Sequence, residues 1–256
     1  MTRDGWSRRR VLVQGGLGAA GLIGAATVPL VWPTQALAID WAALFGRAMD
    51  MEEPAGTLRY LRGHAFSGLR KLKQGDILQS GAQLRVSSGG EAVVRLEDNG
   101  VLRVYGGSVI EVALMRMKEG FLRLITGAVQ AVIPQGQPYL IAGVTATVGV
   151  KGTVVYREVF QPGVRMGTTM DGPMAIPEGA RDYFCNCFGT VEYSHDEDVE
   201  HPFHTSRSTY HDAYFLDPGR SDMLLKAPMF NHFDDDIRSL VDYQQEPRHR
   251  IDWLKH

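Results

Sequence analysis

The sequence has few cysteines and little net charge, and both features exclude classes of protein. Only two of its 256 residues are cysteine, Cys185 and Cys187, so a network of disulfides cannot hold the fold together. The 27 basic and 29 acidic side chains leave a formal charge of −2, and the basic ones are scattered along the chain. Nucleic-acid binding normally needs clustered positive charge, so nucleic acid is not an expected partner.

Catalytic sequence motifs are also missing. The chain contains no G-x-S-x-G, no P-loop, no H-E-x-x-H and no C-x-x-C-H. Serine, histidine and aspartate do occur together between Ser206 and Asp212, but a catalytic triad is a spatial arrangement and not a sequence neighbourhood. We therefore expect a protein that is not an enzyme.

A long hydrophobic run is found only near the N-terminus. Residues 11–39 contain no charged side chain and follow a cluster of arginines. Arg8 and Arg9 resemble the twin-arginine export motif, and Ala36 and Ala38 fit an A-x-A cleavage site. This pattern predicts that residues 1–38 are a cleavable signal peptide.

An uncleaved membrane anchor is the alternative, because the run is long enough to cross about 30 Å of hydrocarbon. Its glycines and prolines weaken a spanning helix, and the small-residue site at Ala36 and Ala38 favours cleavage. Removing residues 1–38 takes away four arginines and one aspartate, which leaves 23 basic and 28 acidic residues and a charge of −5. We expect a periplasmic or otherwise extracytoplasmic protein with no stable membrane span.

The mature chain is predicted to be mainly β. Residues 39–57 are interpreted as a short helix and linker, with apolar residues at helical spacing from Trp41 and an end at Pro54. Residues 58–164 contain short alternating segments, and 18 of the 29 glycines lie between Gly63 and Gly172. Asn99 and Gly100 stand between two such segments and predict a tight β-hairpin.

This β region resembles the FecR domain over about residues 58–160. The matching progression is Gln74-Gly75-Asp76, Gly81-Ala82-Gln83-Leu84, Gly90 to Leu96, Asn99 to Val104, Gly127-Ala128-Val129 and Thr145 to Thr153. Its most specific motif is Val150, Lys151, Gly152 and Thr153, where FecR domains typically have Val-Arg-Gly-Thr. Lys151 keeps the positive charge of that arginine but not its bidentate fork.

The FecR resemblance implies an all-β module, solenoid-like or sandwich-like, on the periplasmic side of the membrane. In the founding members it also implies a relay of an outer-membrane transport signal to a sigma factor. Only ten residues precede the apolar run, too few for a sigma-binding segment, so we do not expect that mechanism here. We expect a module for protein interaction, envelope sensing or signalling, with a protein or cell-envelope component as partner.

Residues 165–256 are predicted to be a smaller α+β segment that carries the cysteines. Residues 181–193 have the aromatic and β-branched composition of a strand, which places Cys185 and Cys187 on the same face. Two such thiolates can chelate a soft ion such as Zn²⁺ or Cu⁺, with His211 and His232 completing the shell. A metal- or cofactor-binding protein is therefore the alternative function.

Two other states of the cysteine pair stay open at this point. Export favours oxidation, although a disulfide between residues i and i+2 closes a small, strained ring. The two residues could also be buried, inert thiols.

The surroundings of His232 predict the start of a helix. Asn231 is placed near the N-cap, ahead of the acidic residues 234–236 and an amphipathic run that includes Ile237 and Leu240. The positive end of the helix dipole would favour the neutral form of His232, which a metal requires.

Overall fold

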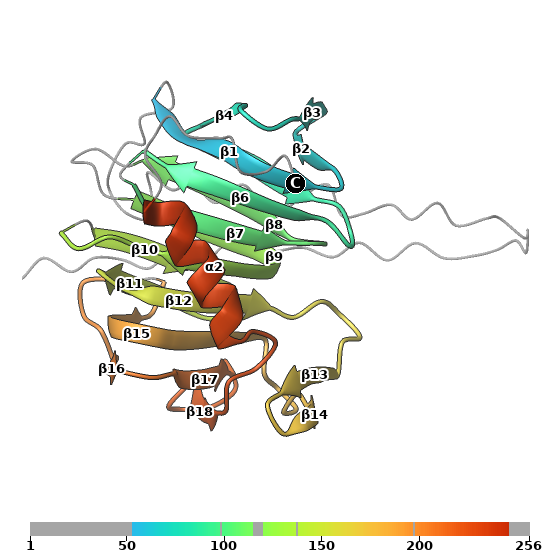
Figure 1. Cartoon of the computed structure of the whole chain (residues 1–256). Coiled ribbons are helices and arrows are strands. Elements are labelled where there is room, and N and C mark those ends of the chain that lie inside the picture. The colour runs from blue at the N-terminus through green and yellow to red at the C-terminus, as the bar shows by residue number, and fades with distance from the viewer. Residues whose placement is uncertain (1–52, 98, 115–119, 137, 197, 246–256) are drawn as a thin grey trace, which may run out of the picture. The chain divides into compact units, whose positions relative to one another are not determined.

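The computed structural model describes residues 53–97, 99–114, 120–136, 138–196 and 198–245, and these residues are mainly β (Figure 1). The strands are β1 (Pro54–Arg62), β2 (Ala65–Ser67), β3 (Arg70–Leu72), β4 (Ile77–Gln79), β5 (Ala82–Val86), β6 (Glu91–Leu96), β7 (Val101–Tyr105), β8 (Val109–Leu114), β9 (Gly120–Val132), β10 (Pro138–Ala142), β11 (Thr147–Lys151), β12 (Val154–Val159), β13 (Met166–Thr169), β14 (Gly172–Ala175), β15 (Asp182–Ser194), β16 (His204–Ser208), β17 (Asp212–Leu216) and β18 (Leu224–Ala227). The described helix is α2 (Asp234–Gln245).

Two strands, β9 and β15, are long and bent, and each belongs to two sheets. The first half of β9 pairs with β8 and β10, and its second half pairs with β7 and β12. β15 likewise pairs first with β12 and β17 and then with β11 and β16. Both bends contain a glycine with positive φ, Gly127 at 83° and Gly189 at 111°. Residues with a Cβ rarely adopt this conformation.

We call the two halves of this arrangement the front sheet and the back sheet. The front sheet runs in the order β4, β1, β6, β7, β9, β12, β15, β17 and β18. The back sheet contains β3, β2, β5, β8, β10, β11 and β16 together with the other halves of β9 and β15. Among the described pairings only β9 with β10 is parallel.

The main core fills the space between the two sheets. Alternate residues of each strand enter it, as the strand period of two requires. Leu102 and Val104 of the front sheet and Leu122 and Leu124 of the back sheet all belong to this apolar cluster. Val101, on the other face of β7, instead packs under α2, which crosses the outward face of the front sheet (Figure 1).

One ion pair is buried in the core. Arg157 and Asp182 have no solvent exposure, and a guanidinium nitrogen lies 2.6 Å from the carboxylate. Arg157 also donates to the carbonyls of Ile141 and Ala146, each at 2.7 Å. A Cβ on Gly143 would lie 2.0 Å from the guanidinium group, so this turn between β10 and β11 needs glycine.

The mainly β prediction is confirmed, and so is the hairpin. β6 and β7 pair antiparallel from Glu91 opposite Tyr105 to Arg95 opposite Val101, and Asn99 has a φ of 70°. The fold is a sandwich with shared strands.

The sheets continue across the predicted boundaries at residues 57 and 164. β1 begins at Pro54, so the last four residues of the predicted linker are part of a strand. β15 to β18 extend both sheets past residue 164, because β15 satisfies the open edges of β11 and β12. The predicted helix near Trp41 lies outside the described residues, as do Arg8, Arg9, Ala36 and Ala38 of the predicted export signal.

The FecR-like motif forms the turn from β11 to β12. Val150 is buried, Lys151 is exposed, and Gly152 has a positive φ of 65°. Buried Thr153 exchanges two backbone hydrogen bonds with Ile133, which closes the turn against the end of β9. The motif therefore has a structural role at this position.

No helix within the described ranges is long and apolar enough to cross a membrane.

Candidate metal centre

The four predicted ligands come together from three segments of the chain. Cys185 and Cys187 lie on the outward face of the front sheet, in the first half of β15. His211 is in the turn before β17, and its backbone N–H donates to the Cys187 carbonyl at 3.1 Å. His232 lies in the segment between β18 and α2. One ligand atom from each residue fits into a group whose members are all within 4.8 Å of one another.

The closest distances join each sulfur to one imidazole and to the other sulfur. Cys185 Sγ lies 3.3 Å from His211 Nδ1, and Cys187 Sγ lies 3.5 Å from His232 Nε2. The two sulfur atoms are 3.7 Å apart, and both cysteines are free. A disulfide needs a separation of about 2.05 Å, so the structure does not contain one.

A hydrogen bond behind each imidazole orients its ring. His211 Nε2 is 2.9 Å from Asp234 Oδ1, and His232 Nδ1 is 2.7 Å from the Phe230 carbonyl oxygen. Because both oxygens only accept, these nitrogens donate, and in the neutral imidazole the other ring nitrogen, which faces the sulfur, carries the lone pair that a metal needs. Carboxylate and carbonyl groups hold metal-binding histidines in this way.

Asn231 is not the N-cap of α2, which corrects the sequence prediction. The helix begins at Asp234, and Asn231 has a φ of 56° that no helical residue adopts. Its side-chain oxygen accepts from the Thr168 N–H at 2.7 Å, while its amide nitrogen donates to Glu158 at 2.9 Å. These bonds fix the chain just before His232. They position its imidazole, and the terminus of the helix does not.

The site is enclosed. Cys185 and His232 have no exposed surface, Cys187 is 4% exposed, and the His211 side chain is 5% exposed. The ring of Tyr156 stacks on His232 with centroids 4.2 Å apart. His201, which lies outside the group, is a contrast among the described residues. Its side chain is 81% exposed and pairs with Asp198.

The pKa values of the two thiols shift in opposite directions. Burial raises the pKa of Cys185, but hydrogen bonds from Cys187, His211 and His232 outweigh it and hold that pKa well below its ordinary value. Burial and the neighbouring Cys185 raise the pKa of Cys187. Burial lowers the pKa of His211, and Cys185 and Asp234 more than reverse that effect. The lowered pKa favours the thiolate of Cys185, which is the form that binds metals.

The four candidate ligands carry a sequence signal, whereas the groups that support them do not. Asp234 is one of the acidic residues 234–236 at the start of the predicted helix, and its contact with His211 depends on the fold. The acidic first turn of α2 is confirmed. Tyr156 and the Phe230 carbonyl carried no sequence signal, because stacking and backbone contacts depend on the fold.

Comparisons with known proteins give little further information. No family model and no curated protein matches the chain. Two crystal structures of a "putative anti-sigma factor" from Parabacteroides distasonis ATCC 8503, at 1.65 and 2.50 Å resolution, align at 15% identity and a TM-score of 0.42. Each alignment covers 58% of this chain and 60% of that chain, which is less than two thirds of the neighbour's length. A likeness at this level supports no argument about this chain, and the FecR resemblance stays a prediction.

Proposed function

We propose that this protein is an exported, non-enzymatic envelope module that binds one Zn²⁺ ion through Cys185, Cys187, His211 and His232. The supporting observation is the convergence of two sulfurs and two imidazole nitrogens within 4.8 Å, with each ring oriented from behind. The side chains that provide the ligands come from three segments of the chain.

The distances fit a tetrahedral ion. With Zn–S bonds of about 2.3 Å, tetrahedral geometry separates two sulfurs by about 3.8 Å. The observed separation of Cys185 Sγ and Cys187 Sγ is 3.7 Å. Two thiolates and two imidazoles in a tetrahedron favour Zn²⁺, while Cu⁺ is the alternative soft ion.

A complete set of four protein ligands is typical of a structural zinc ion. Four protein ligands leave a tetrahedral Zn²⁺ no open position for a substrate, and catalytic zinc sites keep one. Cys185, His211 and Asp234 do form the row of nucleophile, base and acid found in some enzymes. The Cys185 sulfur is buried, however, so a substrate has no approach to it. The ion would instead fasten the segment after β18 to the front sheet.

The interaction role rests on other grounds. The FecR resemblance, the export motif and the absence of catalytic motifs support a module that binds a protein or an envelope component. Affinity purification from periplasm tests this part, and we expect a stoichiometric partner. Recovery of the module alone would contradict it.

Elemental analysis combined with native mass spectrometry tests the metal site. We expect one zinc per chain in protein purified without chelator, loss of that zinc in His232→Gln, and full retention in His201→Gln, which alters an exposed histidine. Copper in place of zinc would identify the other soft ion. Metal-free wild-type protein that does not take up added Zn²⁺ would contradict the proposal.

Cobalt substitution reports the geometry. Co²⁺ at the site is expected to show the intense visible bands of a tetrahedral ion and a thiolate charge-transfer band. Cys185→Ser and Cys187→Ser should each weaken that band. Unchanged spectra in both variants would exclude this pair as ligands, and far-ultraviolet circular dichroism would show that the variants are folded.

A further inference from the structure

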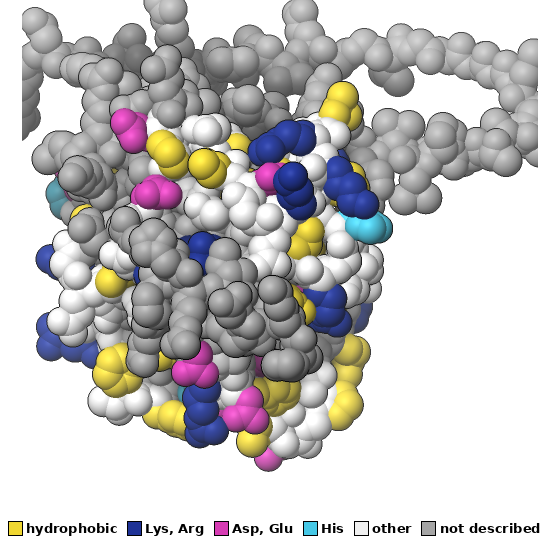
Figure 2. Space-filling model, turned by 45° about the horizontal axis from the view of Figure 1, so that its top comes forward, with side chains coloured by type: hydrophobic (Ala, Val, Ile, Leu, Met, Phe, Trp, Pro, Cys, Tyr) yellow, Lys and Arg dark blue, Asp and Glu magenta, His cyan; other side chains and the backbone are white. Residues whose placement is uncertain are grey.

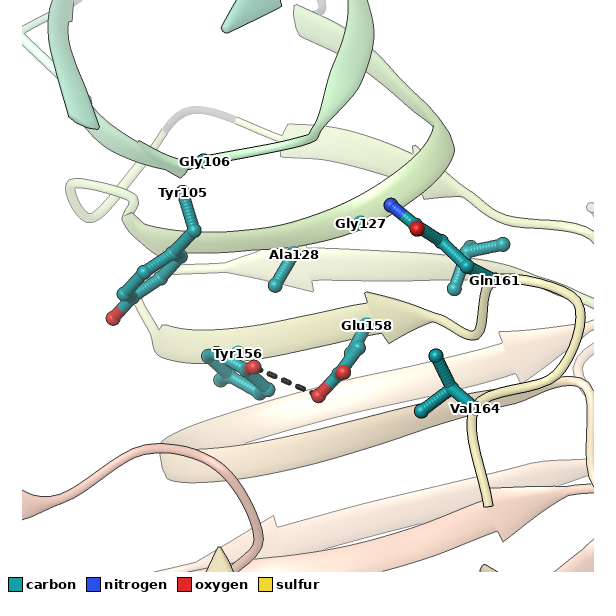
Figure 3. A pocket seen from close by; sticks show the side chains of 9 residues that line it. Tyr105, Gly106, Gly127, Ala128, Tyr156, Glu158, Gln161 and Val164 are labelled. Atoms are coloured by element: carbon teal, nitrogen blue, oxygen red, sulfur yellow. Dashed lines mark hydrogen bonds between the residues drawn. The ribbon is translucent and has the colours of Figure 1, made fainter. Parts of the chain in front are cut away.

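An open cleft of about 240 Å³ lies next to the candidate metal centre, on the outward face of the front sheet. Figure 3 shows the side chains of Tyr105, Tyr156, Glu158 and Gln161 around the small side chain of Ala128. Tyr156 connects the two features, because its ring stacks on His232 and its edge lines the cleft. The metal centre does not use this space.

Glu158 lies in the cleft without a cationic partner. Its carboxylate accepts from the Tyr156 hydroxyl and from the Asn231 amide, both at 2.9 Å, and both donors are neutral. No Lys or Arg in the described part of the chain forms an ion pair with it. Burial raises its pKa, against the effect of the two hydrogen bonds and of the nearby His232. A carboxylate removed from water without a countercharge is unfavourable, and a bound cation would relieve that cost.

The other polar groups of the cleft are also acceptors. Gln161 uses its amide nitrogen on the Gly107 carbonyl at 3.3 Å, which leaves the amide oxygen to accept. The ring of Tyr105 also lines the cleft, and the π-face of an aromatic ring attracts cations. A primary ammonium group has three donors and no acceptor, and it matches this set.

We propose that this cleft binds a primary alkylammonium group, with its charge at Glu158 and its alkyl chain along Val159 and Val164. Both valines line the cleft beside the acceptors. The volume suits a head group with a few methylenes and not a large ligand. The same chemistry is present in a free small amine and in a lysine side chain of a peptide. The proposal does not require the zinc ion, although Tyr156 and Asn231 link the cleft to His232.

Titration of the whole protein with n-butylammonium, followed by calorimetry or NMR, tests the proposal. We expect saturable binding, and at least tenfold weaker binding of n-butanol, which has the same chain without the charge. Equal binding of both compounds, or no binding of n-butylammonium, would overturn the proposal. Nα-acetyl-lysine-N-methylamide is the second probe. Tighter binding of this peptide mimic identifies lysine as the source, and weaker binding identifies a free amine.

Three variants locate the site. Glu158→Gln removes the charge at nearly constant shape and should weaken n-butylammonium binding at least tenfold. Ala128→Leu fills the cleft with the carboxylate intact and should abolish binding, which covers the case in which loss of the Asn231 contact perturbs Glu158→Gln. Glu192→Gln removes an exposed carboxylate from β15 and should bind like wild type. Wild-type affinity in both Glu158→Gln and Ala128→Leu would overturn the proposal. Zinc content, measured on each variant, separates this result from failure of the metal site.

Discussion

The two faces of strand β15 differ in what their polar side chains contact. On the inward face, Asp182 pairs with Arg157, and the Asn186 amide donates to the backbone of Gly189 and Ser206. On the outward face, Cys185 and Cys187 point at each other and at two imidazoles. The polar side chains of the inward face bond to other parts of the fold, although Asp182 Oδ1 and Asn186 Oδ1 are left without a partner, whereas the outward face brings candidate ligand atoms together. Burial alone does not distinguish these two faces.

Breaking the inward pair should have the largest effect on stability. Asp182→Asn leaves the Arg157 guanidinium buried without a countercharge, and we expect a loss of about 3 to 5 kcal/mol in the free energy of unfolding. Urea denaturation of the metal-free protein measures it. Glu192→Gln, at an exposed position of the same strand, should change that free energy by less than about 0.5 kcal/mol. A loss below about 1 kcal/mol in Asp182→Asn would show that this face does not depend on its ion pair.

Removing the metal should affect the outward face selectively. With a chelator, we expect amide hydrogen exchange in residues 228–245 to rise at least about tenfold, because the ion would anchor this segment through His232. Exchange in β6 and β7 should stay the same. The Cys187→Ser variant is the control, since the chelator should make no difference to it. A uniform increase across both sheets would contradict a local role of the ion.

Substitution of Asp234 tests whether the carboxylate that orients His211 contributes to zinc affinity. Asp234→Asn weakens the acceptor that orients His211, and we expect about 10- to 100-fold lower zinc affinity in competition with a chromophoric chelator. Asp235→Asn is the matched control, because the neighbouring carboxylate is 91% exposed and pairs with Arg238. Equal effects of the two substitutions would mean that only the net charge of the helix terminus matters.

The smallest effect is expected at the edge of the front sheet. Lys226 pairs with Asp212, but its side chain is 65% exposed, so Lys226→Met should cost less than about 1 kcal/mol of unfolding free energy. Salt at 0.5 M should reduce the difference further. Lys226, Ser206 and Tyr214 hold the pKa of Asp212 below its usual value against the opposing effect of burial. This contribution is therefore present above the unfolded pKa of about 3.8 and is lost as the pH falls through the lower folded value.

The sequence carried enough information for the strands and for the grouping of the four candidate ligands, and too little for the residues that contact them. Alternation along residues 91–96 and the Asn99-Gly100 turn predicted the β6–β7 hairpin, because these signals are local. The spacing of Cys185 and Cys187 on one strand predicted their common face. Glu158, Tyr156 and Arg157 were not predicted as site or core residues, since their roles come from contacts with distant parts of the chain. The pairing of β15 with β11 and β12, across the predicted boundary at residue 164, is likewise a long-range property without a local sequence signal.

The bent strands β9 and β15 also determine how this protein can be divided. Their halves lie in different sheets, and strands of the front and back sheets alternate along the chain. No single cut of the backbone separates one sheet from the other. A fragment that ends before β15 leaves the edges of both β11 and β12 without their partner, and it exposes the apolar surface between the sheets. Reconstitution from two fragments would therefore require each fragment to supply strands to both the front sheet and the back sheet at the same time.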